Sequence, residues 1–158
     1  MITRTKVRLW LCIALLVCNL CFIWGNSLMS GSVSGAFSDW VKSILSAILP
    51  GFGSGSSDGG GHLLRKLAHF SEFCCLGLCL SWLIRMVCKR AVQWYLFPLL
   101  GGFLAACADE TIQRFVPDRG PSFLDVGIDT LGVTLGIVLI SVGYVIKKKQ
   151  MMLKENIK

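Results

Sequence analysis

Four apolar stretches, each close to the length of a membrane span, constrain this chain more than any other feature of its sequence. An α-helix rises 1.5 Å per residue, so about 20 residues are needed to cross about 30 Å of hydrocarbon. The stretches are Val7 to Gly25, Leu63 to Met86, Val92 to Glu110 and Asp125 to Ile146. The sequence therefore predicts an all-α fold, a polytopic membrane protein with four transmembrane helices.

Composition agrees with this class and limits the number of domains. Apolar residues make up 54% of the 158 residues, and charged residues make up 16%, below the roughly 25% of soluble domains. We expect one transmembrane domain, residues 7–146, followed by a basic tail, residues 147–158. The net charge of +7 invites comparison with nucleic-acid-binding proteins, but the placement of the charges explains it better. No nucleic-acid partner is expected.

Basic residues predict the orientation in the membrane. They cluster before the first stretch, between the second and third, and after the fourth, which places these three segments on the cytoplasmic side. We therefore expect a multi-pass protein of the cell membrane with both termini cytoplasmic. The first stretch could also be a cleaved signal peptide, but its apolar core is slightly long for one. The residues concerned are Arg4, Lys6, Arg8, Arg85, Lys89, Arg90, Lys147, Lys148, Lys149, Lys154 and Lys158.

The longest connection, residues 26–62, contains one further helix pattern. Apolar residues recur at helical spacing from Val33 to Leu49, serines and Asp39 occupy the other face, and Pro50 ends the pattern. This predicts an amphipathic helix at the outer surface, lying in the membrane interface or packed over the bundle. The glycine- and serine-rich run from Gly51 to Gly61 predicts a flexible linker. The eight cysteines fit no disulfide framework, because almost all lie in the spans.

Polar residues gather at the outer ends of three spans. Within each span most of them are spaced three or four residues apart, so that these share one helix face, and Lys66 and Glu110 stand next to them in the sequence. Ionisable groups are costly in lipid, so they should turn toward the bundle interior and one another. We expect the three faces to converge on one outward-opening pocket. The groups are Arg65, Lys66, His69 and Glu72; Asp109, Glu110 and Gln113; and Asp125 and Asp129.

The turn from Val116 to Ser122 joins the third and fourth spans. Pro117 and Pro121 restrict φ, and Gly120 permits a sharp bend. We expect this turn to hold Arg119 over the acidic cluster, where a guanidinium fork could clamp a phosphate or carboxylate.

Two stretches, RKLAHFSEF and DETIQRFVPDRGPSFLDVGIDTLGVTLG, resemble the VanZ-like membrane proteins, named after the teicoplanin-resistance protein VanZ, and FIWGNSLMSG, from Phe22 to Gly31, is similar to the family's end of the first span. Two positions depart from the pattern: Phe73, where a tyrosine is common, and Asp118, where a glycine is frequent. The resemblance implies a multi-span membrane protein. Family members are linked to glycopeptide resistance, without a defined activity, and resistance for this chain does not follow. The matching residues are Lys66, His69, Phe70, Glu72, Asp109, Glu110, Gln113, Phe115, Pro117, Arg119, Asp125, Asp129 and Gly132.

Three interpretations of the polar cluster remain open. In the first, the pocket binds an envelope lipid head group, such as that of a lipid-linked precursor, or a lipophilic glycopeptide. Arg65, Lys66 and Arg119 would contact phosphate, and the surface helix would admit the tail. Glu110, Gln113, Asp125 and Asp129 complete the expected ligand-binding residues.

In the second interpretation, the protein is an enzyme that acts on a phosphate ester of such a lipid. His69 would be the general acid or base, oriented by Glu72 or Asp109. A divalent ion such as Mg²⁺ or Mn²⁺ would suit a set of carboxylates, although the sequence implies no obligatory cofactor. That set would be Asp109, Glu110, Asp125 and Asp129. In the third interpretation, the polar residues only pair with one another and lock the helices together. The sequence does not indicate an oligomeric state.

The predicted orientation is testable by labelling. In a cysteine-free version of the protein, Gly55→Cys should react with a membrane-impermeant maleimide added to intact cells. A single cysteine at Cys88 should react only after the membrane is opened. The opposite pattern would invert the orientation.

Overall fold

The computed structural model describes residues 4–48, 59–120 and 122–155. In these residues the regular structure consists of helices, and no strand is present, which confirms the all-α prediction. The helices are α1 (Arg4–Ser27), α2 (Gly31–Ile48), α3 (Gly59–Val87), α4 (Gln93–Gln113) and α5 (Phe123–Glu155).

Four of these helices, α1, α3, α4 and α5, are long and apolar enough to cross a membrane. Their positions confirm the four predicted spans. Helix α5 has 33 residues, so it extends for about 50 Å and is longer than a bilayer core requires. The predicted basic tail accordingly continues α5 as a helix as far as Glu155.

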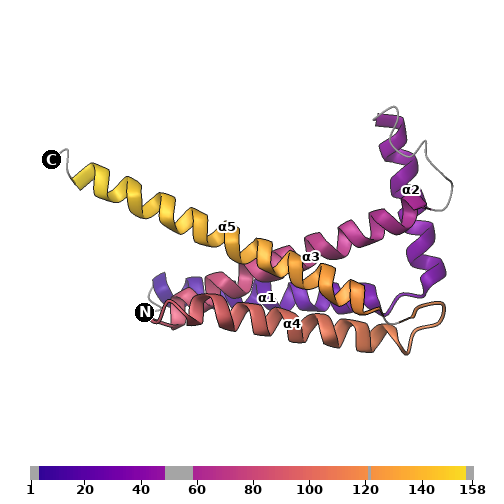
Figure 1. Ribbon diagram of the computed structural model, residues 1–158, viewed down its shortest axis with the longest axis horizontal. Helices are drawn as coiled ribbons and strands as arrows, with labels where there is room; N and C mark the ends of the chain where they lie inside the picture. The colour runs from indigo at the N-terminus through magenta and orange to yellow at the C-terminus, as the bar shows by residue number, and fades with distance from the viewer. Residues whose placement is uncertain (1–3, 49–58, 121, 156–158) are drawn as a thin grey trace.

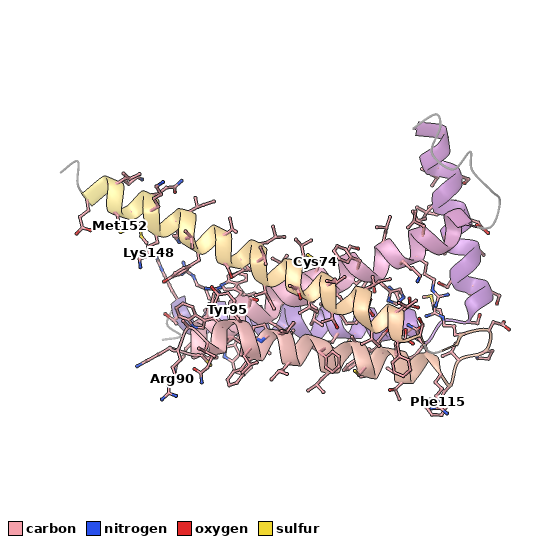
Figure 2. All side chains as sticks on the ribbon, in the orientation of Figure 1. Cys74, Arg90, Tyr95, Phe115, Lys148 and Met152 are labelled. Carbon is pink, nitrogen blue, oxygen red and sulfur yellow. The ribbon has the colours of Figure 1, made fainter. Side chains whose placement is uncertain are left out.

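The four long helices alternate in direction (Figure 1). Both termini and the α3–α4 turn lie at one end, and α2 lies at the other, steeply inclined to α1 and α4. Arg90 and Lys148 share the end with the termini, whereas Phe115 lies at the end with α2 (Figure 2). The clustered basic residues therefore lie at one end of the bundle. The positive-inside rule expects this of a protein that has one orientation in the membrane.

Helix α3 is central, since it packs against each of the other four helices. The core around it is small and apolar, and Phe73 on α3 is fully buried there. The departure from tyrosine at this position thus places an aromatic ring without a hydroxyl in an apolar environment, where no partner for a hydroxyl is needed. The buried core residues are Ile23, Phe73, Leu76, Ala105, Ala106, Val133 and Ile137.

Glycines bring α3 and α5 into backbone contact. A Cβ atom at Gly132 would overlap the carbonyl oxygen of Phe70, and one at Gly136 would overlap that of Cys74. The small-residue pattern GVTLG therefore serves close packing within the chain, as in membrane helix pairs generally. Gly127, which shares a similar spacing in the sequence, has open space beside it and does not take part.

The surface helix begins two residues earlier than predicted, at Gly31, and Leu49 lies outside the described residues. Its apolar side chains Val33, Phe37 and Trp40 are exposed, while Ser38 is buried. The apolar stripe is therefore left largely uncovered by the rest of the chain, as expected for a helix whose apolar side contacts lipid. Most of the predicted linker also lies outside the described residues, but Gly59 to Gly61 are helical and belong to α3.

The α4–α5 turn packs against the start of α2. The backbone N–H of Gly31 donates to the carbonyl oxygen of Pro117, and a Cβ at Gly31 would overlap Asp118. Asp118 has a φ of 60°, a left-handed conformation that favours glycine and that aspartate tolerates better than most residues. The departure from glycine at this position is thus compatible with a glycine-like turn. Pro121 lies outside the described residues.

The close contact between α3 and α5 generates a stability prediction. Gly132→Ala should lower the unfolding temperature in detergent, by an amount corresponding to about 1–3 kcal/mol, because the new methyl group forces the two backbones apart. Gly127→Ala on the same helix is the matched control. It should be neutral or slightly stabilising, since alanine favours helix over glycine. Equal behaviour of the two variants would show that the helices do not touch at Gly132.

Candidate functional site

A polar pocket of about 310 Å³ lies at the end of the bundle where α2 is found. Its lining residues come from α3, α4, α5 and the α4–α5 turn. Eight of the ten predicted site residues line it, and Glu72 and Asp109 lie beside it. The lining residues are Arg65, Lys66, His69, Glu110, Gln113, Asp118, Arg119, Gly120, Ser122, Asp125, Ile128 and Asp129.

Asp109 is the centre of a buried hydrogen-bond network. Its side chain is 0% exposed, and Ser27 of α1 donates its hydroxyl to Oδ1. Gln113, one turn later on α4, donates Nε2 to Oδ2 at 2.7 Å and also contacts the Ser27 oxygen at 3.3 Å. Hydrogen bonds to a charged acceptor are stronger than neutral ones, so α1 and α4 are joined through this carboxylate.

Glu72 is held from the same end of α1. Asn26 donates Nδ2 to Glu72 Oε1 at 2.8 Å, and its backbone carbonyl accepts from Arg119 Nη2 at 3.3 Å. Asn26 therefore links α3 to the α4–α5 turn. Glu72, Asp109 and Arg119 share one region of the bundle end, but the link between Glu72 and Arg119 runs through Asn26.

The remaining charged residues differ in how fully they are paired. Lys66 forms an ion pair with Asp125 at 3.0 Å, and Glu110 accepts from the Ser122 backbone N–H at 2.8 Å. Arg65 reaches the amide oxygen of Gln113 at 3.4 Å. Lys66 is therefore already neutralised, whereas Arg65 contacts only a neutral group in the part of the chain that the structure describes.

Arg119 is a half-buried cation whose hydrogen-bonding groups are only partly satisfied. Two of its nitrogens, Nε and Nη1, are buried without a hydrogen-bond partner among the described residues. Burial, and then repulsion by the neighbouring Arg65, lower the pKa of Arg119 from its ordinary value. Since arginine stays protonated in proteins, its positive charge is held in an unfavourable environment that an anion would improve.

A second, largely apolar groove of about 700 Å³ adjoins the polar pocket. It runs between α2 and α3 and reaches the end of α1. Three residues, Arg65, His69 and Arg119, line both cavities, so a polar space and an apolar space meet at two arginines. The groove is lined by Phe22, Asn26, Met29, Val33, Ser34, Phe37, Ser38, Val41, Leu64, Arg65, Leu67, Ala68, His69, Ser71, Glu72 and Arg119.

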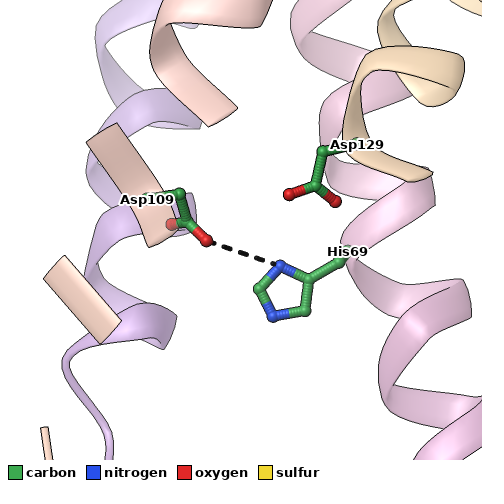
Figure 3. Close-up of side chains that lie close together, drawn as sticks. All are labelled: His69, Asp109 and Asp129. Carbon is green, nitrogen blue, oxygen red and sulfur yellow. Dashed lines mark ion pairs between the residues drawn. The ribbon is translucent and has the colours of Figure 1, made fainter. Parts of the chain in front are cut away.

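Metal-binding residue types also come together here. The described residues bring His69, Asp109 and Asp129 into one group, with one donor atom of each within 4.8 Å of the others. Figure 3 shows the two carboxylates facing the imidazole ring. Of the four carboxylates expected to form a metal site, Asp109 and Asp129 belong to this group. Asp125 and Glu110 instead contact Lys66 and Ser122.

Sequence reasoning missed Asn26 and Ser27, the α1 residues that contact Glu72 and Asp109. Both are small polar residues at the end of an apolar span, a place where such residues need no functional explanation. The signal that could have identified them is their position in NSLMS, directly after the last apolar turn of α1 and therefore at the depth of the other polar faces.

The Asp109 network generates a second prediction. Ser27→Ala removes a donor to a fully buried carboxylate, which costs about 1–3 kcal/mol, so thermal stability in detergent should fall. Ser71→Ala is the control, because Ser71 is exposed and donates only to Ala68 within its own helix. Should Ser27→Ala match the wild type, the Ser27–Asp109 hydrogen bond contributes nothing to the fold.

Three comparisons with known proteins complete the description. A scan against protein-family models matches residues 10–146 to the model described as VanZ/LLP1. Comparisons with curated proteins and with solved structures gave no match. The matched range includes every residue of the polar pocket and of the adjoining groove.

Proposed function

The chain belongs to the VanZ/LLP1 family, and from the two adjoining cavities we propose that it binds the anionic head group of a membrane amphiphile. The observation that carries this proposal is the sharing of Arg65, His69 and Arg119 by the polar pocket and the apolar groove. A molecule with a charged head and a hydrocarbon tail matches both spaces at once. The ligand class is a phosphate-bearing envelope lipid, such as a lipid-linked precursor.

Charge complementarity supports a phosphate at the junction. Arg65 and Arg119 each lack a carboxylate within ion-pair distance among the described residues, and their planar guanidinium groups suit two-point contacts with phosphate oxygens. Lys66 is paired with Asp125, so it would contribute less. Two carboxylates that also line the pocket, Glu110 and Asp129, would accept hydrogen bonds from sugar hydroxyls or amines on the head group.

The groove supports a tail that enters from the side. Its α2 wall presents Val33 and Phe37, both more than half exposed, and its α3 wall presents Leu67 and Ala68. If this end of the bundle faces outward, as the basic residues predict, the groove opens toward the outer leaflet. A lipophilic glycopeptide combines polar groups and an acyl chain in a similar way. It is therefore the second ligand to test. A resistance phenotype would require this protein to bind either the glycopeptide or the molecule that the glycopeptide targets.

An enzymatic function has one specific observation in its favour. His69 lines both cavities, and its Nδ1 lies 3.8 Å from Asp109 Oδ2. A carboxylate behind an imidazole is the usual arrangement for orienting a general acid or base. Under this second candidate function, His69 would act on the phosphate ester of the same lipid.

The binding proposal predicts a clear rank order of ligands. Protein purified in detergent should bind a polyprenyl phosphate saturably, and should bind the matching polyprenol and inorganic phosphate at least about tenfold more weakly. Arg119→Gln should weaken polyprenyl phosphate binding by about 10–100-fold, because a charge-assisted hydrogen bond contributes about 1.5–3 kcal/mol. Equilibrium binding with a fluorescent derivative of the lipid measures both effects.

Arg114→Gln provides the matched control. It removes the same charge from the same turn, but Arg114 is exposed and lines neither cavity, so its affinity should equal that of the wild type. Equal losses in the two variants, or equal binding of the phosphate-free polyprenol, would contradict the proposal. Analysis of the lipid after incubation, with and without divalent metal, separates binding from turnover. Turnover that disappears in His69→Ala at normal protein levels would favour the enzyme.

A further inference from the structure

Three of the long apolar helices each contribute one side chain of a type that can bind a metal to a single cluster at the polar pocket. His69 comes from α3, Asp109 from α4 and Asp129 from α5. Their donor atoms lie within 4.8 Å of one another, and the ring and both carboxylates face the same small space (Figure 3). The two carboxylates are almost fully buried, at 0% and 1% exposure.

The protein leaves part of this group without a hydrogen-bond partner. Asp129 Oδ1 is buried and receives no hydrogen bond from any residue that the structure describes. The distance from His69 Nδ1 to Asp109 Oδ2, 3.8 Å, is too long for a hydrogen bond. Two carboxylates close together in a low-dielectric site repel each other, and stranding one without a partner costs several kcal/mol. A bound dication would balance the two negative charges.

The separations suit a shared ion. Donor atoms that bind one ion at about 2.0–2.2 Å lie roughly 3–4 Å apart, so only small side-chain adjustments are needed from the spacing observed. Asp109 is also positioned from outside the group, because Ser27 and Gln113 donate to its two oxygens. Hydrogen bonds of this kind orient the ligands of metal sites and raise their affinity.

We propose that His69, Asp109 and Asp129 bind a divalent first-row transition-metal ion. One imidazole with two carboxylates suits Mn²⁺, Fe²⁺ or Zn²⁺ better than Mg²⁺ or Ca²⁺, which prefer ligand sets made only of oxygen. On the usual order of affinities, Zn²⁺ binds more tightly than Mn²⁺. His69 and Asp129 also line the polar pocket, so water or a ligand oxygen entering from that pocket can complete the coordination.

This inference shares His69 and Asp129 with the proposed lipid site, but its test does not depend on lipid binding. It uses neither arginine, and it is tested with the metal alone on full-length protein in detergent. Mn²⁺ is the appropriate probe, because the chain has eight free cysteines and thiolates bind Zn²⁺ much better than Mn²⁺. The protein must carry no histidine tag, which leaves His62 and His69 as its two histidines.

We expect chelator-treated protein to bind one equivalent of Mn²⁺ saturably, to release it when Zn²⁺ is added, and to unfold at a higher temperature with the metal than without it. Pulsed electron paramagnetic resonance of bound Mn²⁺ should show coupling to an imidazole nitrogen. That coupling should be lost in His69→Gln and kept in His62→Gln. A coupling lost in His62→Gln instead, or the absence of saturable Mn²⁺ binding to folded wild-type protein, would overturn the proposal.

Asp129→Asn should weaken Mn²⁺ binding by at least about 100-fold, beyond the 10–100-fold typical of residues that only support a ligand. Asp39→Asn is the control, because this substitution makes the same chemical change at a residue that is exposed on α2. Folding is checked separately: without metal, Asp129→Asn should unfold no earlier than the wild type, because the amide has the same shape as the incompletely paired carboxyl group and cannot ionise in the apolar interior. Unchanged Mn²⁺ affinity in this variant would place the ion elsewhere.

Discussion

The arrangement of the helix ends depends on one constraint: a carboxylate buried inside an apolar bundle must receive hydrogen bonds, because its free energy is otherwise high. Asp109 is fully buried on a helix that is long and apolar enough to span a membrane, where an ionised group without partners would be strongly unfavourable. The chain meets this constraint by bringing a serine from α1 and a glutamine from α4 to its two oxygens. Helix ends that are far apart in the sequence are therefore required to meet at one depth, and the pocket is formed by that meeting.

Close packing of α3 against α5 is the second requirement, and it is coupled to the first. Gly132 and Gly136 allow the α5 backbone to touch α3, and Asp129 stands one turn before Gly132 on the same helix. A wider separation at the glycines would move Asp129 away from His69 and open the group that faces the pocket floor. The glycines thus act on the chemistry of the site without contacting it, because apolar packing sets the distance between the polar ends.

Several features of the site could be predicted from helix periodicity and family resemblance. Arg65, His69 and Glu72 share a helix face because of their spacing, and so do Asp109 and Gln113. Their pairing could not be predicted in the same way. Lys66 was expected to contact phosphate, yet it pairs with Asp125, and Arg119 reaches the carbonyl of Asn26. The first two partners lie 59 residues apart and the second two lie 93 residues apart, so no local pattern specifies their contact. The contacts of Asn26 with Glu72 and of Ser27 with Asp109 could not be predicted for the same reason.

The sequence by itself determined the membrane class, the four spans, the end that carries most of the basic residues and the family, because length, apolarity and charge placement act locally along the chain. Only the tertiary structure decided that Asp109 is satisfied from α1, that Arg65 and Arg119 stand where a polar and an apolar cavity join, and that His69, Asp109 and Asp129 converge. The physical reason is that each of these features depends on the rotation and depth of one helix relative to another. Those quantities are set by side-chain packing between distant segments, chiefly the glycine contacts of α5 with α3 and the serine at the end of α1.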